Sequence, residues 1–193
     1  TLILPSGSSI KNKFKFKIKK KNFNIGYFGS LYKSRGVDLI LKLSQIDCDN
    51  DYFIFGDLRH YKNIKIKYYN HNLKLHDYIP YKKVPDNILK MDILLMPYQE
   101  KVVATGNVGN IINFTSPLKL FDYMACGKII ISSRVKVLEE VLKEKKNVIY
   151  VQNFNNVYSW KKEIQKIKFL DSKKLIISQN NLKISKNYVL KKR

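Results

Sequence analysis

Residues 116–133 read SPLKLFDYMACGKIIISS, a pattern that predicts a short helix followed by a buried strand. Ser116 can accept a hydrogen bond from a free backbone N–H at the helix start, and Pro117 suits the first helical position, where an N–H has no partner. Gly127 favours the left-handed conformation that ends many helices. The β-branched run that follows is typical of a strand buried in a sheet.

The start of this predicted helix is a candidate anion site, because its free N–H groups and positive dipole end favour a phosphate. Lys119 lies in the first turn, where a cation opposes the dipole unless an anion is present. Asp122 follows one turn later, and its carboxylate has the acceptors needed to bind a ribose diol. An ordinary capped helix explains the same residues, so the residues alone leave both interpretations open.

The rest of the chain alternates short strands with helices. This alternation predicts an α/β fold with a Rossmann-like, doubly wound parallel sheet and helices on both faces. In such sheets ligands bind beyond the carboxyl ends of the strands, where the strand order reverses. We expect strands at residues 25–29, 52–56, 64–69, 73–79, 92–97, 129–133 and 148–152, and helices at 36–44, 84–91, 116–127 and 137–145 and from about 157 and 172.

The charge of the chain is strongly positive, at a formal +22 over 193 residues. A basic surface can bind nucleic acid or an anionic membrane. The excess is almost wholly lysine, accompanied by abundant Asn, Ile and Tyr, which is the pattern of an AT-rich genome. We therefore attribute part of the charge to mutational bias, do not expect a nucleic-acid partner, and place an anionic membrane surface ahead of it.

The length fits one domain with a real core. Cys48 and Cys126 are too few for a disulfide framework, and no spacing of His, Cys, Asp or Glu suggests a metal site. No apolar run reaches the ~20 residues that span a bilayer, and no signal peptide opens the chain. A cytoplasmic protein is expected.

Residues 1–22 differ from the rest, with a Pro-Ser-Gly turn cluster and then lysines that alternate with apolar residues. We interpret this segment as an interdomain linker and basic stretch, while an edge strand or a membrane-contacting segment remains an alternative. The domain proper is predicted to span residues 23–193. The polar loop at residues 99–115 is long enough to suggest a functional role.

Five segments stand in an order that resembles a known family. The joint pattern is similar to the C-terminal, donor-binding half of GT-B-fold, family-4-like glycosyltransferases, the glycosyl transferases group 1, and extends over the whole chain, including a closing helix at 187–193. The segments are IGYFGSLYKSRGVDLI at 25–40, HDYIP at 76–80, DILLMPY at 92–98, SPLKLFDYMACG at 116–127 and VLEEV at 137–141.

The resemblance implies roles for individual residues. The helix acid Asp122 is expected to bind the ribose, and Tyr78 and Ile79 are expected to lie along the nucleobase. No metal site and no cofactor are implied, because the nucleotide sugar, UDP- or GDP-linked, is the substrate. The residues expected at the donor diphosphate are Gly29, Ser30, Arg35, Ser116, Leu118 and Lys119.

The sequence departs from the family pattern at Phe114, where many members place a sugar-binding glutamate. Glu100 or Asn113 could substitute for that acid. None of the histidines, His60, His71 and His76, suggests a general base, so no catalytic residue is assigned.

Members of the family also have an N-terminal, acceptor-binding domain, whereas this sequence begins at the linker. The resemblance therefore implies the nucleotide-sugar-binding half of a retaining, metal-independent hexosyltransferase that acts on a polysaccharide or lipid-linked acceptor. We expect the chain to need an N-terminal domain as its partner for activity, and its lysines to meet the inner membrane face. The alternative is a non-catalytic basic α/β module that binds nucleotide, nucleic acid or an anionic membrane.

Overall fold

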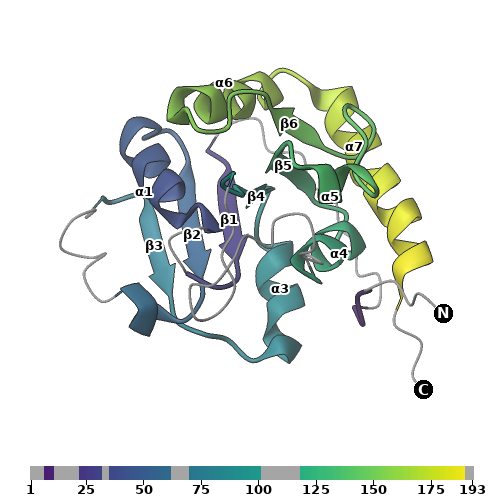
Figure 1. The fold of residues 1–193 in the computed structure, drawn as a ribbon, viewed down its shortest axis with the longest axis horizontal. Coiled ribbons are helices and arrows are strands. Elements are labelled where there is room, and N and C mark those ends of the chain that lie inside the picture. The colour runs from purple at the N-terminus through teal and green to yellow at the C-terminus, as the bar shows by residue number, and fades with distance from the viewer. Residues whose placement is uncertain (1–6, 11–21, 32–34, 62–69, 101–117, 190–193) are drawn as a thin grey trace.

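The computed structural model describes residues 7–10, 22–31, 35–61, 70–100 and 118–189. Within them a six-stranded parallel sheet is covered by helices on both faces, so the predicted α/β, doubly wound class is confirmed (Figure 1). The strands are β1 (Asn24–Phe28), β2 (Asp51–Phe55), β3 (Leu73–His76), β4 (Ile93–Met96), β5 (Ile129–Ser133) and β6 (Ile149–Val151), and the helices are α1 (Val37–Ile46), α3 (Val84–Leu89), α4 (Leu118–Ala125), α5 (Lys136–Glu139), α6 (Val157–Ile167) and α7 (Asp171–Ser185).

The strand order is β3-β2-β1-β4-β5-β6, with every neighbouring pair parallel. β1 therefore lies at the centre, and Ile25 pairs with Tyr52 on one side and Ile93 on the other. From β1 the strand order runs outward to β2 and β3 on one side, and to β4, β5 and β6 on the other side. This is the switch point at which parallel sheets of this type open a crevice.

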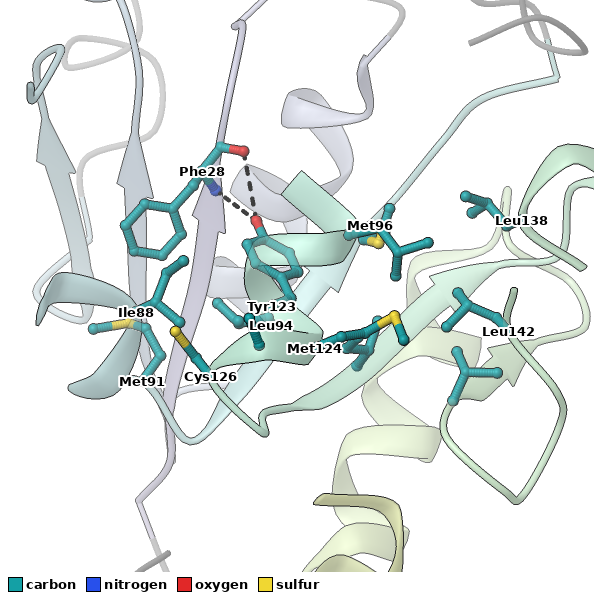
Figure 2. Close-up of a cluster of buried hydrophobic side chains, with 14 of the residues drawn as sticks. Phe28, Ile88, Met91, Leu94, Met96, Tyr123, Met124, Cys126, Leu138 and Leu142 are labelled. Carbon is teal, nitrogen blue, oxygen red and sulfur yellow. Dashed lines mark hydrogen bonds between the residues drawn. The ribbon is translucent and has the colours of Figure 1, made fainter. Parts of the chain in front are cut away.

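Each face of the sheet has its own hydrophobic cluster. On one face, α1 and α6 pack against each other and against the sheet, with Leu41, Tyr52 and Trp160 fully buried between them. On the other face, α3, α4 and the segment from α5 cover Leu94 and Met96 of β4, and Met124 packs there from α4 (Figure 2). α7 packs along α4 on this second face (Figure 1).

Tyr123 fixes α4 to the end of β1. Its buried hydroxyl accepts a hydrogen bond from the Phe28 backbone N–H at 2.9 Å and lies 3.5 Å from the Phe28 carbonyl oxygen (Figure 2). Burial raises the pKa of Tyr123, so the side chain remains a neutral phenol. The bond holds the helix start beside Gly29, the residue that follows β1.

The C-terminal end of α4 stops as the sequence predicts. Gly127 has a φ of 59°, the left-handed conformation that a glycine adopts without steric cost. The next two carbonyl groups are then taken up by α7, because Ser178 Oγ donates to Gly127 O at 2.5 Å and Asn181 Nδ2 donates to Lys128 O at 2.9 Å. α7 is thus joined to α4 by polar contacts in a buried interface.

Two elements are shorter than predicted. β3 ends at His76 instead of residue 79, because β2 ends at Phe55 and the Asp77 carboxylate accepts from the Tyr78 N–H at 2.7 Å, which turns the chain. The prediction of a helix at 137–145 is wrong beyond Glu139, where α5 (Lys136–Glu139) ends. Asn147 ends it by accepting from Lys143 N at 2.7 Å, an alternative to a helical bond.

Of the predicted closing helix at 187–193, the described residues 187–189 are not α-helical, because a 3₁₀ turn at Lys186–Tyr188 leads to a bridge between Val189 and Ser8, and residues 190–193 lie outside the described part of the chain. The predicted strand at 64–69, most of the basic stretch and nearly all of the 99–115 loop lie outside the described residues.

Candidate functional site

A cavity of about 380 Å³ opens at the carboxyl ends of β1 and β2, against the start of α4. Most of the predicted site residues meet there: Gly29 and Ser30 after β1, Tyr78 and Ile79 after β3, and Leu118, Lys119 and Asp122 on α4. Ser116 lies outside the described residues. The cavity is completed by Phe28, Phe55, Gly56, Asp57, Tyr81 and Val84.

Lys119 is held at the β1 end of the cavity. Its Nζ donates to Tyr27 Oη at 3.1 Å and lies 4.3 Å from the centre of the Tyr27 ring and 5.7 Å from that of Tyr98. Gly29 has a φ of 148°, and a Cβ at this position would lie 2.7 Å from Lys119 Nζ. Glycine is therefore needed both for the backbone turn and for the close approach of the amine.

Arg35 is a second cation beside Lys119, although its side chain does not line the cavity itself. It forms a hydrogen bond with Tyr98, and its buried Nε has no hydrogen-bond partner among the described residues. Burial, and then the charge of Arg35, lower the pKa of Lys119 to about 7. Two neighbouring cations that pair with no described carboxylate form a site that an anion would stabilise.

Asp122 lines the same cavity one helical turn after Lys119 and is only 8% exposed. Its Oδ1 accepts from Ser8 Oγ at 2.6 Å and from Tyr81 Oη at 2.9 Å. Burial raises the pKa of the Asp122 carboxyl group, whereas these two hydrogen bonds act in the opposite direction. Oδ2 accepts from no donor in the described part of the chain, so one oxygen is held and the other is available.

Two stacked aromatic rings form another part of the cavity wall. The Phe28 and Phe55 rings lie 4.4 Å apart and within 3° of parallel, and His76 continues the stack at 4.4 Å from Phe55. Burial and the charges of Lys74 and Lys90 lower the pKa of His76, so the ring is favoured in its neutral form. Tyr78, with 72% of its surface exposed, lies at the rim.

Several residues that line the cavity or contact its lining were not indicated by sequence patterns. Ser8 and Tyr81 meet Asp122 from positions far away in the chain, and no local motif encodes such a contact. Phe28 and Phe55 each stand directly before a glycine at a strand end, which was the one available signal. Glu100, one of the two residues that could substitute for the sugar-binding acid, accepts from Asn155 Nδ2 at 2.9 Å, and the other, Asn113, lies with Phe114 outside the described residues.

No group of three or more His, Cys, Asp or Glu side chains that could hold a metal ion occurs within the described ranges. Among the same residues, no helix is long and apolar enough to cross a membrane.

One protein-family model matches most of the chain. The model of the glycosyl transferases group 1 matches residues 8–184. No curated protein matches the chain significantly.

Solved structures share the fold at low identity. They include the C-terminal domain of the group 1 glycosyl transferase LpcC from Francisella tularensis (TM-score 0.67, 15% identity, 88% of this chain and 87% of that one). Sucrose-phosphate synthase from Thermosynechococcus elongatus gives 0.74, with 13% identity over 96% of this chain and 47% of that one.

Anabaena HepE in complex with UDP-glucose gives a TM-score of 0.65, with 15% identity over 86% of this chain and 44% of that one. The chain thus spans less than half the length of HepE and sucrose-phosphate synthase, and most of the length of the isolated LpcC domain.

Proposed function

We propose that this chain, which belongs to the glycosyl transferases group 1, is the nucleotide-sugar-binding part of a hexosyltransferase. The observation that carries the proposal is that a buried amine and a carboxylate line the same cavity: Lys119, beside Gly29 and near the second cation Arg35, and Asp122. A nucleoside diphosphate carries both groups that these side chains would bind, an anionic diphosphate and a ribose diol.

The roles of the individual residues follow from this placement. Lys119 and Arg35, with the backbone at Gly29, Ser30 and Leu118, would bind the diphosphate, because charge-assisted hydrogen bonds to phosphate are strong. For Ser116, which lies outside the described residues, the same role rests on the family resemblance alone. Asp122 would accept from the ribose hydroxyls. The base would lie by Tyr78 and Ile79, over the stacked Phe28 and Phe55 rings.

The wider reaction is part of the same proposal. The donor would be a UDP- or GDP-linked sugar, and UDP-glucose in the HepE structure supports the first choice. Transfer would retain the configuration of the sugar and would need no metal or other cofactor. An N-terminal domain would bind the acceptor, a polysaccharide or a lipid-linked molecule. Without that domain the chain would be inactive. The lysine-rich surface would meet the cytoplasmic face of the membrane.

The direct test is calorimetric titration with UDP and GDP. We expect saturable binding of one or both, weakened about tenfold or more in Asp122→Ala, because hydrogen bonds to a charged group contribute about 1.5–3 kcal/mol. Asp49→Ala removes the same charge from an exposed carboxylate that does not line the cavity and is the matched control. No nucleotide binding, together with tight and steeply salt-dependent DNA binding, would overturn the proposal.

A second variant separates the phosphate role from a general loss of structure. Arg35→Ala should weaken binding of the nucleoside diphosphate and leave binding of the nucleoside unchanged. Equal loss of both would contradict a phosphate role for Arg35. Lys168→Ala, which removes a cation from the α6–α7 connection, should change neither affinity.

A further inference from the structure

The segment at residues 7–10 lies across the end of α4 and is fixed there. Ser8 N donates to Tyr188 O at 2.8 Å, and Ser8 forms a bridge with Val189. The Tyr188 ring packs 4.9 Å from the ring of Phe121, the neighbour of Asp122. Ser8 is consequently 3% exposed and has a defined position next to the carboxylate.

The Ser8 hydroxyl has one direction in which to donate. Its oxygen accepts from Ile10 N at 3.0 Å and lies 2.6 Å from Asp122 Oδ1. A carboxylate oxygen can only accept, so the hydroxyl hydrogen is directed at Asp122. A short bond of this kind to a charged acceptor is among the stronger hydrogen bonds in proteins.

Tyr81 reaches the same oxygen from a different part of the chain. Its hydroxyl donates to Asp122 Oδ1 at 2.9 Å, and Ser9 Oγ lies 3.3 Å from that hydroxyl. Tyr81 comes from the 3₁₀ turn Tyr81–Lys83, between β3 and α3, and lines the cavity. Two donors from unrelated parts of the chain thus fix Oδ1 and the rotation of the carboxyl group.

We propose that Ser8 and Tyr81 are positioning residues that hold the Asp122 carboxylate in one orientation, with Oδ2 presented to the ribose, and so set the preference for ribonucleotides over deoxyribonucleotides. The inference rests on the proposed function, since it assigns Asp122 to the ribose. Its new content is that ribose recognition depends on a hydroxyl in the segment that precedes the first strand.

The test compares UDP with 2′-deoxy-UDP and 3′-deoxy-UDP by calorimetry on the full chain, or the corresponding GDP set if GDP binds. The measured quantity is the ratio of the UDP affinity to the affinity of each deoxy analogue. In this ratio the effect of diphosphate ionisation cancels, because all three ligands carry the same diphosphate. The wild-type chain should prefer the ribonucleotide. Ser8→Ala and Tyr81→Phe should each reduce that preference by about threefold to tenfold, the size of one lost hydrogen bond.

Three controls distinguish positioning from general destabilisation. Ser8→Thr retains the hydroxyl and should restore the preference. Ser44→Ala removes an equally buried serine hydroxyl whose bond is to Leu41 O within α1, and should leave the preference unchanged. Tyr81 is 47% exposed, so Tyr81→Phe should fold even if Ser8→Ala does not.

A pH series adds an independent measurement. Because the Ser8 hydrogen bond lowers the pKa of Asp122, its removal should move the acidic loss of ribose preference to higher pH. An unchanged preference in Ser8→Ala and Tyr81→Phe, or an equal loss of affinity for ribo- and deoxynucleotides, overturns the inference while the proposed function stands. Absence of any UDP or GDP binding to the wild-type chain overturns both.

Discussion

Lys119 places its amine where water is largely excluded, between the Tyr27 ring and Gly29. Burial and the neighbouring Arg35 lower its pKa to about 7, so near neutral pH the amine is about half charged. A bound diphosphate favours the charged form. Part of the binding free energy of the anion is therefore used to protonate the Lys119 amine.

We expect nucleoside diphosphate affinity to fall as pH rises from about 7 to 9, because the unliganded amine loses its proton over this range. Binding at pH 8 should be accompanied by proton uptake, measured by calorimetry in two buffers of different ionisation enthalpy. In Lys119→Arg, which stays charged at all these pH values, the slope should disappear. An identical slope in that variant would show that another group titrates.

The same residue should lower stability when no ligand is bound. The amine binds protons more tightly in the unfolded chain, whose lysine pKa is about 10.4, so its contribution to the free energy of unfolding rises with pH between about 7 and 10. Lys119→Met should therefore melt at a higher temperature than wild type at pH 7, and the difference should narrow by pH 9. A lower melting temperature at pH 7 would contradict this account.

At the scale of elements, buried polar side chains of α7 hydrogen-bond to backbone carbonyl groups of the segments it packs against. Asn181 donates to Lys128 O at 2.9 Å and to Asn147 O at 3.0 Å, and so connects the ends of α4 and the α5 segment. Asn181→Ala leaves both carbonyl groups without this donor and should lower the free energy of unfolding by about 1–3 kcal/mol.

Urea denaturation measures this difference. The neighbouring Asn180→Ala removes an exposed amide with one bond to Lys146 O and should cost less than about 1 kcal/mol. Equal effects of the two variants would mean that α7 is held by its apolar contacts and not by Asn181.

The sequence predicted most elements, because apolar periodicity and terminal glycines are local properties. The sequence-based prediction was wrong where a contact with a residue outside the element sets the end of a helix or strand. The helix after β5 was extended to residue 145 because nothing in its pattern reveals that Asn147 would bond to Lys143 N and Val141 O. Tyr78 and Ile79 are residue types that favour strands, but β2 offers no partner beyond Phe55.

The same distinction applies to the site. Strand ends and the start of α4 could be located from local patterns, which brought Gly29, Lys119 and Asp122 to one edge of the sheet. Ser8 could not be found in this way, since its contact with Asp122 joins positions that are 114 residues apart. The roles of these residues in binding a nucleotide sugar stay predictions until ligand binding is measured.

At the scale of the whole molecule, the formal charge of +22 repels itself across one compact domain. Salt screens such repulsion over about 10 Å at 0.1 M. We expect the melting temperature to rise between 0.02 and 0.3 M NaCl by about 2–4 °C, which corresponds to about 1 kcal/mol for a chain of this size.

Lys119→Met is the control for that measurement. If general screening is responsible, the variant should show nearly the same rise, because it removes one charge among many. A rise confined to the wild-type chain would instead show that an anion binds beside Lys119.

The central place of β1 also shapes how the chain is made. β1 leaves the ribosome before the other five strands of this sheet and pairs with β2, but its other edge receives no partner until β4 follows. At about 5–20 residues per second, synthesis from Phe55 to Ile93 takes about 2–8 s. During that interval the nascent half-sheet exposes an apolar strand edge, the kind of surface that chaperones bind and that otherwise aggregates. A slower-translated message would lengthen the exposure without altering a single contact of the finished protein.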